Sequence, residues 1–202
     1  MKARSSSVLS TIVKSAAMSD LLKVIVFVGA TAGIVCFFWR SLRNTKSHGF
    51  YRFFAFEAIV VMILLNLDYW FYRPFSPHQI ISWLLLLISL FLVIHGFLLL
   101  LMVGKPKSER NDTSLIGIEK TTELVRVGAY RYIRHPIYSS GLFGTCGVFF
   151  KHPSWVGLGL ALITTFFWTM TAKTEEAENI RFFGGAYQGY MKQTKMFIPF
   201  LF

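Results

Sequence analysis

The sequence predicts an all-α protein, a polytopic membrane helical bundle of about five transmembrane helices followed by a cytoplasmic helix near the C-terminal end. Two observations predict this fold class. Of the 202 residues, 54% are hydrophobic and only 15% are charged, a composition too apolar for an ordinary soluble domain. The hydrophobic residues also gather in long runs, and a helix needs about 20 such residues to cross a bilayer. We expect one membrane domain over residues 1–202.

Five hydrophobic runs give the expected spans, at residues 21–39, 53–71, 80–103, 136–150 and 154–172. The run at 80–103 is the clearest, with His95 as its one strongly polar residue. The run at 136–150 is short for a full span unless its helix begins at the membrane interface with His135 and Pro136. The polar residues 104–134 form a cytoplasmic linker, and residues 173–202 form a cytoplasmic tail that begins with a polar helix.

Residues 1–20 are polar and basic, with hydrophobic residues recurring at helical spacing. This pattern allows either a short amphipathic helix on the membrane surface or a frayed terminus. We favour the frayed terminus.

Basic residues are distributed unevenly among the loops, which predicts the orientation. The loop at 40–52 and the linker at 104–134 are rich in Lys and Arg, whereas the turn at 72–77 has only Arg73. Basic loops face the cytoplasm, so the first two segments lie inside and the turn outside. The basic N-terminal segment disagrees with this orientation, and we rely on the internal loops. The net charge of +11 is spread over such loops and forms no continuous basic surface, so we expect no nucleic-acid partner.

The two cysteines, Cys36 and Cys146, both lie inside hydrophobic runs and form no C-x-x-C pair. A thiol in such surroundings is normally an inert packing residue. The sequence predicts neither a disulfide scaffold nor a metal site.

Two polar blocks carry the candidate chemistry. The first is residues 128–138, with the sequence GAYRYIRHPIY, and the second contains Glu175 and Glu176, followed by the aromatic residues Phe183, Tyr187 and Tyr190. The hydrophobic runs between the blocks form a hairpin, so both blocks meet at one membrane surface. Pro136 suits the first position of a helix, and Arg134 and His135 then lie beside amides that have no partner in the helix. Taken alone, those two residues are better explained as anchors of the helix to lipid headgroups.

The combination of both blocks resembles the C-terminal half of integral-membrane methyltransferases of the isoprenylcysteine carboxyl methyltransferase and phospholipid methyltransferase superfamily. The resemblance covers about residues 120–202. It departs from the common pattern at Ala129, Ser140 and Phe182. It implies S-adenosylmethionine as the methyl donor, a pocket covered by the C-terminal helix, and a lipidated or lipid-like acceptor, most simply a carboxylate of the isoprenylcysteine type.

The residue types in the two blocks suit such a donor, because a carboxylate can bind its ammonium group and aromatic faces can lie near its sulfonium. The candidate cofactor-binding residues are Tyr130, Arg134, His135, Pro136, Tyr138, Glu175, Glu176 and Tyr187. Glu175 and Glu176 point about 100° apart on a helix, so at most one faces the pocket squarely. The resemblance also implies catalytic roles: Glu175 or Glu176 contacts the cofactor, and Arg181 orients the acceptor carboxylate.

His95 has two readings, an acceptor-pocket residue or a hydrogen-bonding group between helices. Three alternatives to a carboxylate methyltransferase stay open. They are a phospholipid amine N-methyltransferase, a sterol-type membrane reductase that binds a reduced nicotinamide cofactor, and a non-catalytic membrane scaffold. In each case the lipid bilayer is the partner that the composition requires.

Overall fold

A computed structural model describes residues 2–105 and 121–201, with side chains from residue 20 onward. Its helices are α1 (Lys2–Leu42), α2 (His48–Leu65), α3 (Pro77–Met102), α4 (Pro136–Phe149), α5 (Trp155–Phe183) and α6 (Gly185–Gln193), with short 3-10 turns η1 (Leu67–Tyr69) and η3 (Gly128–Arg131). No strand forms within these described residues. Four helices, α1 from Asp20, α2, α3 and α5, are long and apolar enough to cross a membrane. The predicted class, a polytopic helical membrane bundle, is confirmed.

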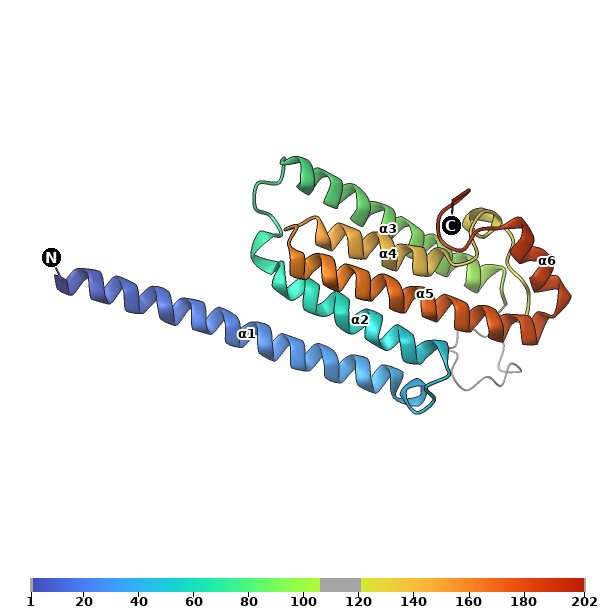
Figure 1. Cartoon of the computed structure of the whole chain (residues 1–202), viewed down its shortest axis with the longest axis horizontal. Helices are drawn as coiled ribbons and strands as arrows, with labels where there is room; N and C mark the ends of the chain where they lie inside the picture. Colours follow the sequence, from blue (N-terminus) through green and yellow to red (C-terminus); the bar gives the residue numbers. More distant parts are fainter. Residues whose placement is uncertain (1, 106–120, 202) are drawn as a thin grey trace.

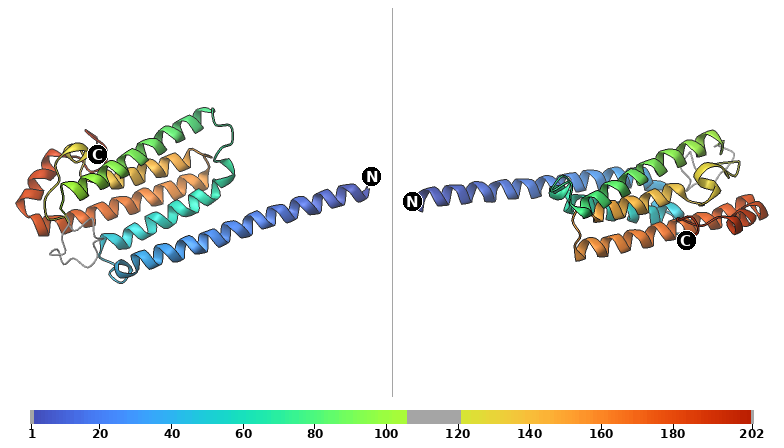
Figure 2. Two further views of the ribbon diagram at one scale, coloured as in Figure 1. Left: turned by 180° about the vertical axis from the view of Figure 1, so that it is seen from behind. Right: turned by 90° about the horizontal axis from the view of Figure 1, so that it is seen from above.

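Helices α2, α3, α4 and α5 lie side by side, and α1 packs along α2 and projects beyond the bundle (Figures 1 and 2). The backbone of α1 is helical from Lys2, where we expected a frayed terminus. No glycine or proline occurs before Gly29, so nothing in the sequence interrupts the helix. The predicted linker at 104–134 is described only in part, since residues 106–120 lie outside the described residues.

Two helices have ends that differ from the predicted runs. Helix α2 begins at His48, five residues before the hydrophobic run, because the Ser47 hydroxyl caps it by accepting a hydrogen bond from the Phe50 amide (3.3 Å). Helix α5 continues to Phe183, past the end of its hydrophobic run, and stops at Gly184 with φ 59°. Glycine adopts that left-handed conformation without steric cost. Where each helix enters the membrane stays a prediction.

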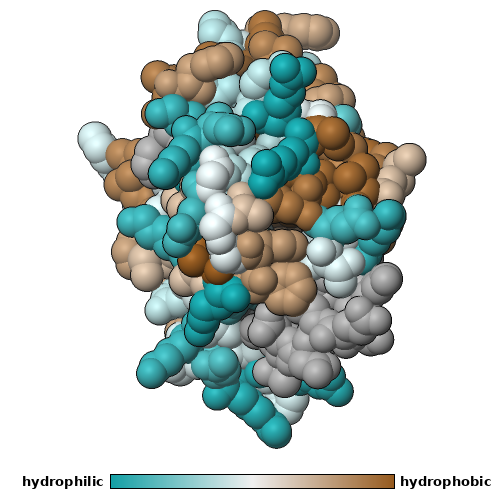
Figure 3. All heavy atoms as spheres, turned by 90° about the vertical axis from the view of Figure 1, so that its right-hand side faces the viewer, coloured by the Kyte–Doolittle hydropathy of each residue, from teal (hydrophilic) through white to brown (hydrophobic). Residues whose placement is uncertain are grey.

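The shortness of α4 makes room for the site. Its 14 residues span about 21 Å, whereas the 29 residues of α5 span about 44 Å. Helix α4 packs against α3 through glycines: a Cβ at Gly147 would lie 2.8 Å from the Leu86 side chain, and one at Gly144 would lie 3.0 Å from the Ser89 hydroxyl. Both α3 and α5 therefore continue past the start of α4 at Pro136. Hydrophilic and hydrophobic residues alternate over this end of the molecule (Figure 3).

The other end of α4 is held by side chains of neighbouring elements. The carbonyl of Gly147 accepts from the Ser82 hydroxyl (2.6 Å), and that of Val148 accepts from the Asn66 amide (2.9 Å). The last carbonyls of a helix have no partner within it, and buried ones need partners from elsewhere. These contacts satisfy them.

Beside those caps lies a buried lysine. The Lys151 ammonium lies 3.2 Å from the centre of the Trp83 ring and donates to the Gln79 side chain (3.1 Å). Its side chain is fully buried, and burial lowers the pKa of Lys151 to about 8.

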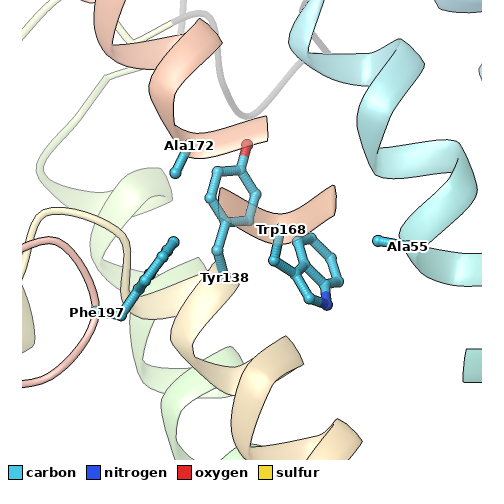
Figure 4. Packing of buried hydrophobic residues seen from close by; sticks show 5 residues of the cluster. All are labelled: Ala55, Tyr138, Trp168, Ala172 and Phe197. Carbon is cyan, nitrogen blue, oxygen red and sulfur yellow. The ribbon is translucent and has the colours of Figure 1, made fainter. Parts of the chain in front are cut away.

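A buried cluster connects the bundle to the site (Figure 4). It consists of Ala55, Tyr138, Trp168, Ala172 and Phe197, from α2, α4, α5 and the C-terminal segment. The Tyr138 and Trp168 rings are stacked with centres 5.4 Å apart. This packing fixes the ring of Tyr138, so its hydroxyl is held toward the polar side chains of α5.

Candidate active site

Backbone hydrogen bonds join the first polar block to the C-terminal segment. Ile133 and Lys195 form an isolated parallel bridge, in which the Arg134 amide donates to the Lys195 carbonyl (2.8 Å) and the Lys195 amide donates to the Tyr132 carbonyl (3.0 Å). The Ser139 hydroxyl donates to the Phe197 carbonyl (2.8 Å). Residues 132–139 and 195–197 are therefore held together, although some 60 residues separate them in sequence.

Glu176 is bound by two residues of the first block. The Arg134 Nε donates to its Oε1 at 2.6 Å, and the His135 Nε2 lies 3.2 Å from the same oxygen. The Arg134 guanidinium also donates to the carbonyls of Met191 (3.2 Å) and Thr194. The side chains of Arg134 and Glu176 are only 10% and 9% exposed. Glu176 thus ties α5 to the start of α4, and Arg134 ties both to the C-terminal segment.

Glu175 has different surroundings. One of its oxygens accepts a hydrogen bond from the Tyr138 hydroxyl, and the other lies 3.4 Å from the Asn179 amide nitrogen. The Nδ1 of His135 is 3.9 Å from Glu175, too far for a hydrogen bond. Glu175 has no basic residue within hydrogen-bond distance among the described residues. Its side chain faces an open cavity.

The cavity has a volume of about 620 Å³, open to solvent, and lies beyond the start of α4 between α3, α5 and α6. Its lining residues are Leu100, Thr121, Leu124, Val125, Tyr130, Arg134, His135, Ile137, Tyr138, Glu175, Asn179, Phe183, Tyr187 and Tyr190.

Six of the residues predicted to bind a cofactor therefore meet in one cavity: Tyr130, Arg134, His135, Tyr138, Glu175 and Tyr187. Pro136 starts α4 directly behind the lining, and Glu176 supports Arg134 and His135 from behind. Of the two adjacent carboxylates, the structure turns Glu175 toward the cavity.

Arg181 and His95 lie elsewhere. The Arg181 side chain is exposed, with its Nε 3.3 Å from the Ala177 carbonyl on the same helix, and it does not line the cavity. The His95 Nε2 accepts a hydrogen bond from the Ala129 amide (3.4 Å), and its ring is stacked on Phe91. His95 therefore hydrogen-bonds to the short turn η3 of the linker, and it does not line the cavity.

The tyrosines give the cavity neutral hydroxyl groups. Tyr187 and Tyr190 are both 3% exposed, and the Tyr190 hydroxyl donates to the Tyr130 carbonyl (2.6 Å). Burial raises the pKa of Tyr187 above its usual range, and the negative charges of Glu175 and Glu176 raise it further. The Tyr187 hydroxyl therefore stays protonated at neutral pH.

The sequence patterns missed the polar lining residues Asn179 and Thr121, together with the hydrophobic residues Leu100, Leu124 and Val125. One signal was available for Asn179, which follows Glu175 by four residues and so shares its helical face. Nothing comparable marks the residues from the linker.

The profile of the phospholipid methyltransferase family matches residues 77–185, from the first residue of α3 to the first residue of α6. The chain belongs to the phospholipid methyltransferase family. This confirms the predicted superfamily, and the family implies a membrane methyltransferase. The matched range contains Arg134, His135, Glu175 and Glu176, so the site lies within it. No curated protein matches the chain.

Proposed function

We propose that this protein transfers a methyl group from S-adenosylmethionine to a lipophilic acceptor at the cytoplasmic surface of the membrane. The observation that carries the proposal is the position of Glu175 in an open cavity, among tyrosines and without a basic partner within hydrogen-bond distance in the described chain. Membership of the methyltransferase family supports it.

The lining residues fit this cofactor by chemical type. Glu175 offers a carboxylate for its ammonium group, and the rings of Tyr130 and Tyr187 offer electron-rich surfaces for a sulfonium cation. When bound, the cofactor supplies an activated methyl group on sulfur. The protein contributes mainly position, because a direct displacement requires acceptor and donor to be aligned in a site that excludes water.

Glu176, Arg134 and His135 have a supporting role in this proposal. Their mutual contacts hold α5, α4 and the C-terminal segment in fixed relation, so that Glu175 and Tyr138 stay on the cavity wall. Arg134 and His135 line the cavity but are both directed to Glu176.

The charged side chains that line the cavity also favour one class of acceptor. A carboxylate acceptor needs a cationic partner, and the two basic side chains of the described lining, Arg134 and His135, both contact Glu176, while Arg181 is exposed outside the cavity. An amine acceptor needs no such cation, because it reacts as the neutral amine. We therefore propose an amine-bearing lipid first and the isoprenylcysteine-type carboxylate second.

The experiment is methyl transfer from labelled S-adenosylmethionine, using purified protein in lipid vesicles that contain an amine headgroup lipid or a prenylcysteine. Alkali releases the label of a methyl ester as methanol but leaves an N-methyl group intact, so the product type identifies the acceptor class. Label in lipid that is lost in Glu175→Gln and kept in Glu123→Gln, an exposed control, supports the proposal.

No transfer to either acceptor by the wild-type protein, together with binding of a reduced nicotinamide cofactor, would favour the reductase alternative. Alanine at Arg181 tests the second acceptor. If Arg181 aligns a carboxylate, Arg181→Ala lowers the yield of methyl ester and leaves cofactor affinity unchanged.

A further inference from the structure

Asn179 lines the cavity, and it belongs neither to the two sequence blocks nor to the contacts among Arg134, His135 and Glu176. It lies on α5 one turn after Glu175, so the two side chains share a helical face, and both line the cavity. The helix thus presents a carboxylate and a side-chain amide next to each other.

The contacts of Asn179 set the direction of its amide. Its Nδ2 lies 3.4 Å from the Glu175 Oε1, longer than the usual 2.7–3.2 Å for such a hydrogen bond, and its side chain is also hydrogen-bonded to Tyr187. The amide lies between a carboxylate that faces the cavity and a buried neutral phenol. A side-chain amide carries two N–H donors, which suits Asn179 to a carboxylate ligand that enters the cavity beside Glu175.

We propose that Asn179 binds the carboxylate of the methionine part of S-adenosylmethionine, while Glu175 beside it binds the ammonium group. The inference rests on the proposed function. The two charged groups of an amino acid are attached to a single carbon atom, so they require an acceptor and a donor that lie close together. Glu175 and Asn179 provide that pair on one helical face.

The other strong donor of the lining is Arg134. Its Nε is directed to Glu176, and its Nη1 donates to the carbonyls of Met191 and Thr194. Its charge is therefore compensated within the protein. Asn179 carries no charge of its own, so it can bind a carboxylate beside Glu175 without drawing Glu175 into an ion pair.

The test compares two ligands by titration calorimetry: S-adenosylmethionine and its decarboxylated form, which keeps the sulfonium and the amine but lacks the carboxylate. Hydrogen bonds to charged groups contribute about 1.5–3 kcal/mol, so Asn179→Leu should weaken S-adenosylmethionine by about tenfold to a hundredfold. The same variant should bind the decarboxylated ligand within about threefold of wild type. Asn179→Asp, which places a negative charge at this position, should weaken S-adenosylmethionine further and strengthen the decarboxylated ligand.

Gln188→Leu is the control, because Gln188 is exposed and follows Tyr187. Thermal melting of each variant without ligand establishes that it is folded, and Asn179→Asp serves if Asn179→Leu does not fold. Equal losses for both ligands would overturn the inference, since Asn179 would then act only by orienting Glu175. Unchanged affinity for both would also overturn it. Wild-type protein that binds neither ligand would overturn the proposed function itself.

Discussion

Glu176→Gln should destabilise the folded protein even when no cofactor is present. In the structure Glu176 neutralises Arg134, whose Nε lies 2.6 Å from Oε1, and both side chains are almost fully buried. Removing one partner of a buried ion pair costs about 3–5 kcal/mol, because the remaining charge is left without compensation. Arg134 keeps the carbonyls of Met191 and Thr194, so we expect the lower end, about 3 kcal/mol.

The assay is thermal unfolding of purified protein in detergent. For a chain of this length, 1 kcal/mol corresponds to about 2–4 °C, so Glu176→Gln should lower the melting temperature by about 6–12 °C. The control is Glu123→Gln, which removes an ion pair with Lys105 in which both side chains are more than half exposed. Such pairs contribute about 0–1 kcal/mol. If Glu176→Gln melts like Glu123→Gln, the supporting role of Glu176 is wrong.

Three further predictions concern other parts of the molecule. Gly141→Ala should lower the free energy of unfolding by about 1–3 kcal/mol, since a Cβ there would lie 2.5 Å from the buried indole ring of Trp168. Gly159→Ala is the control: a Cβ at Gly159 would have nothing within 4 Å, so this variant should be neutral or slightly stabilising in the same melting assay. Burial lowers the pKa of Lys151 to about 8, so between about pH 8 and 10 the unfolded chain binds more protons than the folded one. The melting temperature of wild type minus that of Lys151→Met should therefore rise with pH over this range. If this difference falls with pH, the lowered pKa of Lys151 is wrong. In sealed vesicles, with both native cysteines removed, an impermeant thiol reagent should label Asn44→Cys and Ser76→Cys from opposite sides; labelling from one side refutes the orientation.

The helices were predictable where hydrophobicity alone determines them, and their ends were not. The start of α2 was missed because His48 and Arg52 look like loop residues. Both are buried, His48 against Glu178 at 2.7 Å and Arg52 over the Phe38 ring at 5.1 Å. Partners so distant in sequence cannot be read from local hydropathy.

The site was predictable in composition and only partly in arrangement. Helical geometry predicted that one of Glu175 and Glu176 would face the pocket. Which one depends on Arg134 and His135, more than 40 residues away, which both contact Glu176. Asn179 was missed because only the folded chain shows that it lines the cavity together with Glu175.

The central claim, that Glu175 faces a cavity that binds S-adenosylmethionine, is tested most directly by titration calorimetry on wild-type protein and Glu175→Gln in detergent. We expect saturable binding to wild type and a loss of about tenfold or more in Glu175→Gln, with the melting temperature of the ligand-free variant close to that of wild type. Ligand binding to the folded state should also raise the melting temperature of wild type. No heat and no shift at millimolar S-adenosylmethionine, or equal affinity in both proteins, would contradict it.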